Sequence, residues 1–331
     1  MHKCAKGAAV EDYSAEGRRT RQALRAAQLY YVQDQTMESI ARELAVSRSS
    51  VSRLLSFARD TGIVEINVSA PDQHVGDIER RLGERYSVRA HVVPTPDTLS
   101  DVERLERVGM NAARLVGEFV ESHMTVGVAW GSTMSVVSKH LVSRPTRHSE
   151  IVQMNGAGNT QSTGIEYSSD ILQRFGQAFG ARVQQFPVPA FFDDPSTREA
   201  LWRERSIRRL LELQSRMDLA IFGVGTPFSE VPSHVYIGGF LGPNDYRSLK
   251  ADHAVGDVAT VFFRADGSST NIALNARSSG PRLATLKRVP RRLCVASGAQ
   301  KFAGVRGALE GSLVTDLVVD EALARRLAES R

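Results

Sequence analysis

A cluster of arginine and serine residues between positions 47 and 56 has the types and spacing of a surface that reads DNA. Arginine can form two hydrogen bonds to guanine, and serine can bond a base edge or a phosphate oxygen. If this segment is a helix, its apolar residues face one side and these polar residues face the other. We therefore predict that the following side chains contact DNA: Ser47, Arg48, Ser49, Ser52, Arg53 and Ser56.

Two short helices joined by a tight turn would position these side chains. Apolar residues recur at helical spacing on both sides of a break near Ala45, which is typical of a helix-turn-helix. They are Ile40, Ala41 and Leu44 before the break and Val51, Leu54 and Leu55 after it. Ser47 can cap the second helix, because its hydroxyl accepts a backbone N–H. The alternative is an ordinary helical hairpin with a solvated outer face, since the turn has Ala45 where glycine is usual.

Positive charge is concentrated in the same segment. Residues 18–59 contain eight arginines and three acidic residues, which leaves a net charge of +5. The whole chain also has a net charge of +5, so the remainder is balanced. A localised basic face favours binding to phosphates.

The sequence divides into three predicted regions. Residues 1–17 are small, polar and without periodicity, which predicts a disordered tail. Residues 18–33 have an apolar stripe that predicts a helix covering the reading pair, and Gly62 ends the third helix. Partial alternation in residues 63–68 predicts a strand, the wing of a winged helix-turn-helix. The predicted boundaries are a tail at 1–17, a DNA-binding domain at 18–70 and a larger domain at 71–331.

The larger domain alternates apolar runs with helical stretches, which predicts an α/β fold with a doubly wound, mainly parallel sheet. The predicted strands are 88–94, 125–130, 150–154, 183–187, 219–224, 258–263, 293–296 and 313–319. The predicted helices are 75–86, 101–122, 134–143, 170–179, 196–217, 300–310 and 321–329. Ligands of such sheets bind at the carboxyl ends of the strands, so the loops that follow the strands are candidate sites.

Two of these loops offer hydrogen-bonding groups. Gly131, Ser132 and Thr133 come between a strand and a helix, where backbone N–H groups and two hydroxyls can bind an anion. Simple helix capping is the alternative. Asn155 and Gly156 begin a glycine-rich turn whose amides can bond sugar hydroxyls, although a plain turn explains the pattern equally well.

Two further loops are more ambiguous. Residues 223–226, Gly-Val-Gly-Thr, weakly resemble a dinucleotide fingerprint, but Pro227 follows and no third glycine opens a helix. This keeps an NAD-sensing regulator as a minor alternative. Lys301 enters a helix just after a strand and would be a good partner for an anion, whereas a single lysine is more often solvated.

Composition excludes several other classes. The chain of 331 residues is 42% hydrophobic and 24% charged, as expected of a soluble globular protein. The only cysteines are Cys4 and Cys294, and the histidines are scattered. The sequence therefore predicts no disulfide framework and no metal site. It has no membrane-length apolar run and no signal core, so we expect a cytoplasmic protein. No candidate loop has a histidine or paired carboxylates placed to move a proton, so we expect no catalytic residues and no cofactor.

Four segments, taken in order, carry a resemblance to a known family. They are residues 24–68, VGVAWGSTM at 126–134, AVGDVATVFFRADG at 254–267 and VPRRLCVASGAQKFAGVRGAL at 289–309. Together they resemble the SorC family of bacterial sugar-responsive transcription regulators, over about residues 23–327. The resemblance implies an N-terminal helix-turn-helix and an effector domain similar in fold to sugar-phosphate isomerases. It also implies assembly into dimers or tetramers on operator DNA and a phosphorylated sugar, or a relative of one, as the effector.

The resemblance also implies particular site residues. The family's phosphate loop falls on Gly131–Thr133, and the turn at Asn155 and Gly156 lines its pocket. Its acidic position falls on Asp257 and its pocket lysine on Lys301. The segment Arg264-Ala265-Asp266 departs from the pattern of many relatives, which leaves open whether Asp266 contributes. The predicted effector-binding residues are Gly131, Ser132, Thr133, Asn155, Gly156, Gly225, Thr226, Asp257 and Lys301.

These observations predict a DNA-binding transcription regulator, specifically a repressor of a carbohydrate catabolic operon. A sugar, polyol or sugar phosphate would control its binding to the operator. The expected partners are double-stranded operator DNA, the small-molecule effector and further copies of the chain in a homodimer or homotetramer, with no membrane. The alternative is an enzyme of the sugar-phosphate isomerase or deaminase type that carries an appended DNA-binding head.

Overall fold

The computed structural model describes residues 15–64, 73–96, 98–160, 162–227 and 234–330. The chain forms two compact units, Met1–Ala70 and Pro71–Arg331, and each is described by itself.

The N-terminal unit is a small helical bundle. It contains α1 (Ala15–Ala27), the π-helical turn η1 (Gln28–Val32), α2 (Met37–Glu43) and α3 (Arg48–Asp60). Helix α1 begins at Ala15, so residues 15–17, which were expected in the tail, are helical. The predicted wing strand is not seen at Ile63 and Val64, which form a bend, and residues 65–68 lie outside the described part.

The apolar spacing read from the sequence builds the core of this unit. The buried side chains of this core are Ala23, Ala26, Ala27, Leu29, Ile40, Val51, Leu54, Leu55 and Ala58. Ser47 caps α3 as predicted, because its Oγ accepts the N–H of Ser50 at 3.1 Å. The turn between α2 and α3 places Ala45 at φ 52°, a left-handed conformation that costs a non-glycine residue roughly 1–2 kcal/mol. The helix-turn-helix therefore forms without the usual glycine.

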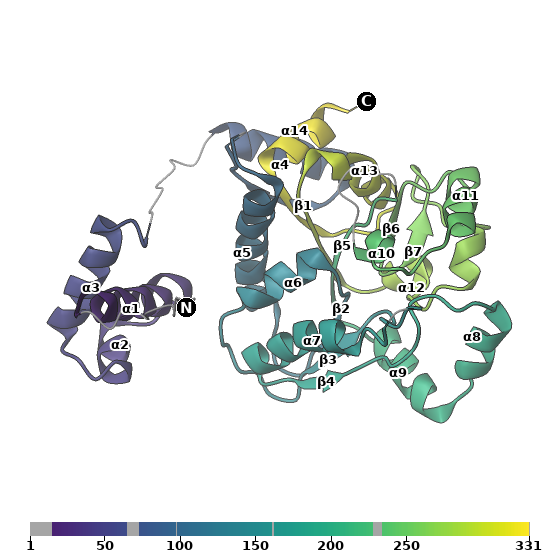
Figure 1. Cartoon of the computed structure of the whole chain (residues 1–331). Coiled ribbons are helices and arrows are strands. Elements are labelled where there is room, and N and C mark those ends of the chain that lie inside the picture. Colours follow the sequence, from purple (N-terminus) through teal and green to yellow (C-terminus); the bar gives the residue numbers. More distant parts are fainter. Residues whose placement is uncertain (1–14, 65–72, 97, 161, 228–233, 331) are drawn as a thin grey trace, which may run out of the picture. The chain divides into compact units, whose positions relative to one another are not determined.

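The larger unit is organised around a seven-stranded sheet in the order β1-β9-β8-β5-β2-β3-β4 (Figure 1). All of its strand pairs are parallel. Its strands are β1 (Arg89–Val93), β2 (Thr125–Val128), β3 (Glu150–Gln153), β4 (Arg182–Gln184), β5 (Leu219–Gly223), β8 (Arg291–Ala296) and β9 (Asp316–Asp320). Seven of the predicted strands thus appear in the sheet, which confirms the predicted fold class.

Helices cover both faces of the sheet. One face packs against α4 (Gln73–Tyr86), α9 (Arg205–Ser215), α13 (Phe302–Glu310) and α14 (Glu321–Glu329), and the other against α5 (Asp101–Phe119), α6 (Ser132–Lys139) and α7 (Ile165–Phe179). Along β9, Leu317 and Val319 face the first group and Val318 faces the second, and all three are fully buried. Burying each such side chain stabilises the fold by roughly 1.5–3 kcal/mol, which explains the continuous apolar strands.

The predicted strand at 258–263 is wrong, because this segment forms a hairpin outside the main sheet. It pairs β6 (Gly256–Val258) with β7 (Val261–Phe263) in antiparallel register. Between them, Ala259 and Thr260 have φ values of 47° and 67°. Two consecutive left-handed residues make the tight turn that a two-residue hairpin requires.

The predicted helix at 196–217 is also divided. It forms α8 (Pro195–Leu201) and α9, with Trp202 at the break. The ring of Trp202 packs against Phe186 and Phe192, with centroid distances of 5.6 and 5.4 Å. Four short helices were not predicted: α10 (His234–Ile237), α11 (Pro243–Ala251), η2 (Ala273–Ala276) and α12 (Leu283–Leu286). The predicted helix at 300–310 begins one residue early as the 3₁₀ turn η3 (Ala299–Lys301) and continues as α13.

Candidate DNA-binding surface and effector site

The residues predicted to contact DNA share one side of α3. Ser47, Arg48, Ser49, Ser52 and Arg53 are exposed and Ser56 is half-buried, whereas the opposite side of the helix, including Val51 and Leu55, is buried. The packing therefore presents the arginine and serine side chains outward together.

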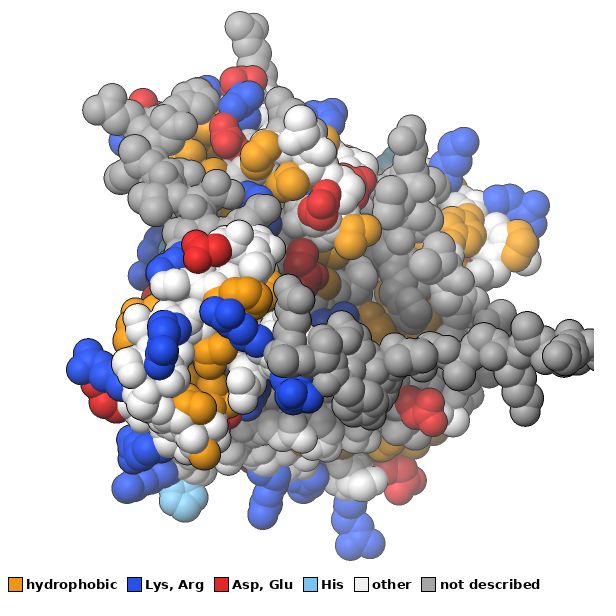
Figure 2. All heavy atoms as spheres, turned by 60° about the vertical axis from the view of Figure 1, so that its left-hand side comes forward, with side chains coloured by type: hydrophobic (Ala, Val, Ile, Leu, Met, Phe, Trp, Pro, Cys, Tyr) orange, Lys and Arg blue, Asp and Glu red, His pale blue; other side chains and the backbone are white. Residues whose placement is uncertain are grey.

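The two arginines of this surface already have partners within the unit. The Nε of Arg48 lies 3.1 Å from Oε1 of Glu38 on α2, and both side chains are largely exposed. Arg53 donates from Nε to the carbonyl of Ser49 at 3.4 Å. In Figure 2, Lys and Arg side chains are scattered among uncharged and acidic side chains. Because the exposed contacts of Arg48 and Arg53 are weak, the two arginines can exchange them for contacts with a nucleic acid.

The first predicted loop opens helix α6 beside the carboxyl end of β2. Gly131 is the N-cap of α6 at φ 150°, a backbone conformation suited to glycine, and Ser132 and Thr133 form the first turn. A Cβ atom on Gly223, at the end of β5, would lie 3.3 Å from Oγ1 of Thr133. The free N–H groups of α6 and the threonine hydroxyl therefore meet the end of the neighbouring strand, in an arrangement suited to an anion.

Trp130, which the sequence analysis did not single out, joins this loop to the next one. Its Nε1 donates to the carbonyls of Gly156 at 2.9 Å and Asn155 at 3.2 Å. Its ring stacks on Phe240 with a centroid distance of 5.1 Å. Its position directly before Gly131 was the only signal in the sequence.

The loop after β5 makes room for a carboxylate. Gly225 and Asp257 exchange two backbone hydrogen bonds, of 2.9 and 3.0 Å, which attaches β6 to the end of β5. A Cβ atom on Gly225 would lie only 1.9 Å from Oδ1 of Asp257. Glycine is needed at this position because the Asp257 side chain fills the space that a Cβ atom would occupy.

Asp257 is buried and its carboxylate is held by two donors. Oη of Tyr236 donates to Oδ1 at 2.5 Å, and the backbone N–H of Thr260 donates to Oδ2 at 3.1 Å. Burial raises the pKa of Asp257, and the Tyr236 hydrogen bond opposes this shift. Sequence reasoning missed Tyr236, which lies on the short helix α10 and bears no recognisable motif.

Lys301 enters the same region from η3. Its Nζ donates to the carbonyl of Val224 at 3.0 Å. Burial lowers the pKa of Lys301, while the negative charge of Asp257 acts in the opposite direction. A cation and an anion are therefore held close together beside the end of β5.

Seven predicted residues line a single cavity with an empty volume of about 490 Å³, part of it open to solvent. The seven are Gly131, Ser132, Thr133, Asn155, Gly225, Asp257 and Lys301. Oδ1 of Asn155 is buried without a hydrogen-bond partner among the described residues, so it is available as an acceptor.

Three other candidates do not line this cavity. Gly156 is packed behind it, where its N–H donates to Oγ of Ser279 at 2.9 Å. Thr226 is buried against α13, since a Cβ atom on Gly304 would lie 2.7 Å from its methyl group. Asp266 is exposed in the turn after β7, where its carboxylate accepts the N–H of Ser268.

Neither a metal cluster nor a membrane span is found in the described part of the chain. Its histidine, cysteine and acidic residues form no group of three or more that could hold a metal ion. None of its helices is long and apolar enough to cross a bilayer.

A helix-turn-helix unit followed in the same chain by an α/β unit with a ligand cavity defines a class of protein, the ligand-responsive transcription regulators. Residues 72–329 match the Sugar-bind family, which is described as a sugar-binding domain. The chain is 34% identical to the deoxyribonucleoside regulator of Bacillus subtilis (strain 168), over 92% of this chain and 96% of that protein. It is 26% identical to the sorbitol operon regulator of Klebsiella pneumoniae, over 91% and 95% of the two chains.

Solved structures agree with this assignment. The full-length sorbitol operon regulator SorC from Klebsiella pneumoniae superimposes with a TM-score of 0.71 at 25% identity, covering 94% of this chain and all of that one. A domain of a possible sugar-binding transcriptional regulator from Arthrobacter aurescens TC1 gives a TM-score of 0.74 at 54% identity, over 79% of this chain and all of that one. The chain belongs to the SorC family of sugar-binding transcriptional regulators.

Proposed function

We propose that this regulator represses a carbohydrate catabolic operon and that an anionic sugar derivative controls its binding to the operator. The observation that carries the proposal is the cavity, whose lining combines donors and a cation suited to an anion with acceptor oxygens suited to hydroxyls. Two relatives are named a sorbitol operon regulator and a deoxyribonucleoside regulator, and these names support a carbohydrate-type effector.

The anion would bind between α6 and η3. The first N–H groups of α6 carry the positive end of the helix dipole, and Thr133 adds a hydroxyl donor. The Lys301 ammonium supplies a full positive charge at the same cavity. Together these groups favour a phosphate over an uncharged group.

The remainder of the ligand would carry hydroxyls. Asp257 and Asn155 present acceptor oxygens to the cavity, and an ionised carboxylate has no donor of its own. A second phosphate would be repelled by Asp257, whereas a sugar hydroxyl can donate to it. The ligand therefore has two chemically different ends, which fits a sugar monophosphate.

Titration calorimetry with the phosphorylated and free forms of one sugar tests this proposal. In Thr133→Val a hydrogen bond to a charged group is lost, so affinity for the phosphorylated form should fall by roughly 1.5–3 kcal/mol while the free sugar is unaffected. The variant should still bind operator and ignore the inducer. Ser52→Ala, on the other unit, is the control and should leave calorimetry unchanged. A free sugar that binds as tightly as its phosphate would contradict the anion site.

We also propose that the chain assembles as a homodimer or homotetramer through the larger unit and acts in the cytoplasm, where operator DNA is accessible. A single helix-turn-helix contacts few bases and usually works with a symmetric partner, so the operator should be an imperfect palindrome. A fragment starting at Pro71 should sediment as a dimer or larger. A monomeric fragment would place the interface in the N-terminal helices.

An isomerase or deaminase activity is the competing function, because Asp257 is a buried carboxylate beside a ligand cavity. Both of its oxygens already accept hydrogen bonds, and we propose that it orients the sugar and transfers no proton. Turnover of candidate sugar phosphates by the wild type, abolished in Asp257→Asn, would favour the enzyme instead.

A further inference from the structure

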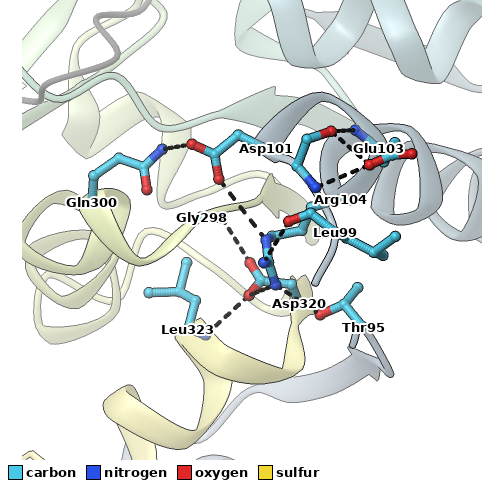
Figure 3. Close-up of polar contacts among 10 residues, drawn as sticks. Thr95, Leu99, Asp101, Glu103, Arg104, Gly298, Gln300, Asp320 and Leu323 are labelled. Carbon is cyan, nitrogen blue, oxygen red and sulfur yellow. Dashed lines mark hydrogen bonds and ion pairs between the residues drawn. The ribbon is translucent and has the colours of Figure 1, made fainter. Parts of the chain in front are cut away.

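Arg104 is a buried arginine in the first turn of α5, outside the cavity. Its side chain is 11% exposed. Nη1 donates to Oγ1 of Thr95 at 3.1 Å and Nη2 donates to the carbonyl of Leu99 at 3.2 Å (Figure 3). A buried guanidinium is costly unless it is paired, so its location requires a specific arrangement of acceptors and negative charge.

Asp320 supplies the negative charge from the end of β9. It is fully buried, and its Oδ1 lies 3.8 Å from Nη1 of Arg104, an ion pair too long to be a hydrogen bond. The same carboxylate caps α14 by accepting the N–H of Leu323 at 3.1 Å, and its Oδ2 accepts the N–H of Gly298 at 2.7 Å. One side chain thus connects α5, α14 and the loop after β8.

That loop carries Lys301. Gly298 is the N-cap of η3 and has φ 96°, and its carbonyl accepts the N–H of Lys301 at 3.0 Å. From α5, Asp101 accepts a hydrogen bond from Nε2 of Gln300 at 3.2 Å. Figure 3 shows the Arg104 guanidinium between Asp101 and Asp320. Asp101 in turn contacts Gln300, and Asp320 contacts Gly298.

We propose that Arg104 and Asp320 are positioning residues for the effector site, which hold η3 so that the ammonium of Lys301 faces the cavity. This inference rests on the proposed role of Lys301 in binding an anion. Asp320 anchors the loop by its N-terminal amide. Arg104 neutralises that carboxylate and, through Thr95 and Leu99, ties it to the connection between β1 and α5. Neither residue touches the ligand, so both act only through Lys301.

The environment of Lys301 can be followed by NMR after reductive methylation with ¹³C-formaldehyde, which labels lysine side chains. The chain has six lysines, so few signals compete with that of Lys301. The Lys301→Arg variant identifies the signal of Lys301 by its absence. Titrating the full chain with base and then with inorganic phosphate reports the pKa of Lys301 and the affinity for an anion. Asp320→Asn should release η3 and expose Lys301 to water, which relieves the burial that lowers its pKa and moves that pKa toward its ordinary value. The same variant should weaken phosphate binding about tenfold, a change of roughly 1.4 kcal/mol.

Glu321→Gln is the matched control, since it removes the same charge one residue away and, within the described part of the chain, breaks the ion pair of Glu321 with Arg325. It should change neither quantity. Arg104→Lys keeps the charge but not the guanidinium fork, and it should give a smaller shift in the same direction. If Asp320→Asn does not fold, Arg104→Lys alone tests the proposal.

Lys301 signals and phosphate affinities that match the wild type in both Asp320→Asn and Arg104→Lys would overturn the positioning role. If the pKa of Lys301 shifts in these variants but the wild type binds no phosphate, the positioning role stands and the proposed anion site fails.

Discussion

The two units of this protein use arginine in opposite ways. In the N-terminal unit the side chain of Arg48 is 70% exposed and pairs with an exposed glutamate. In the larger unit the side chain of Arg104 is 11% exposed and pairs with a fully buried aspartate. An exposed guanidinium keeps its hydration and can exchange partners, whereas a buried one is held in place by the cost of separating it from its counterion. The burial of an arginine, rather than its presence, therefore distinguishes a candidate DNA contact from a candidate structural residue.

Ala45 in the N-terminal unit and Gly225 in the larger unit restrict substitution for different reasons. Ala45 adopts a left-handed conformation in an exposed turn, where the cost is only that of the backbone. At Gly225 the space that a side chain would need is taken by the Asp257 carboxylate. A side chain at Gly225 would therefore have to displace the Asp257 carboxylate.

The largest expected effect tests whether the two units are independently stable. Leu55→Ala removes a buried side chain from the N-terminal unit and should destabilise it by about 2–5 kcal/mol. Calorimetry should show a lowered transition for that unit only. Leu317→Ala, in the core of the sheet, is the counterpart and should lower only the other transition. One shared transition that moves in both variants would mean that the units unfold together.

The next largest effect concerns the exposed arginines. Arg48→Ala and Arg53→Ala should each weaken operator binding, by about 1–3 kcal/mol where the arginine makes a bidentate base contact. Effector binding should remain at the wild-type level, because neither residue belongs to the larger unit. Operator affinities can be measured by fluorescence anisotropy at fixed salt. Wild-type affinity in both variants would remove α3 from the DNA interface.

The pH dependence of binding should distinguish the effector site, which uses Lys301, from the DNA-binding surface, which uses arginines. Burial lowers the pKa of Lys301, so its ammonium is lost as the pH rises through that lowered value, and affinity for inorganic phosphate should fall by at most about tenfold per pH unit. Arginines stay charged in this range, so operator binding should be flat between pH 8 and 10. Lys301→Arg should make phosphate binding flat as well. A flat wild-type profile would show that Lys301 does not bind the anion.

The smallest expected effect comes from the exposed pair on the N-terminal unit. Glu38→Gln releases Arg48 and removes a negative charge near the DNA-binding surface, so operator affinity should rise, by less than about 1 kcal/mol. The gain should shrink with added salt. Glu43→Gln, which frees Arg25 instead, is the matched comparison. A loss of operator affinity in Glu38→Gln would indicate that Glu38 itself contacts a base or orients Arg48.

Much of the fold could be predicted because it depends on local periodicity. The helical repeat around Ile40 and Leu55 and the apolar runs of the parallel strands follow from which faces must be buried, and that is visible in a short stretch of sequence. Within the cavity, Gly131, Thr133 and Lys301 could be predicted because each follows a strand of the main sheet directly. Asp257 was predicted from a family resemblance. The hairpin that begins beside it was predicted as a single strand at 258–263, since the tight turn at Ala259 and Thr260 has no glycine or asparagine to mark it.

The sequence alone determined which segments are amphipathic, where the positive charge is concentrated and which loops follow the strands. Only the tertiary structure decided which distant groups meet: Tyr236 with Asp257, Val224 with Lys301, and Arg104 with Asp320. The last two partners are separated by more than two hundred positions in the chain, and no local pattern encodes their proximity. Burial is also decided by the tertiary structure. A charge that would be solvated in an isolated helix is held in place by its partners once the surrounding elements exclude water.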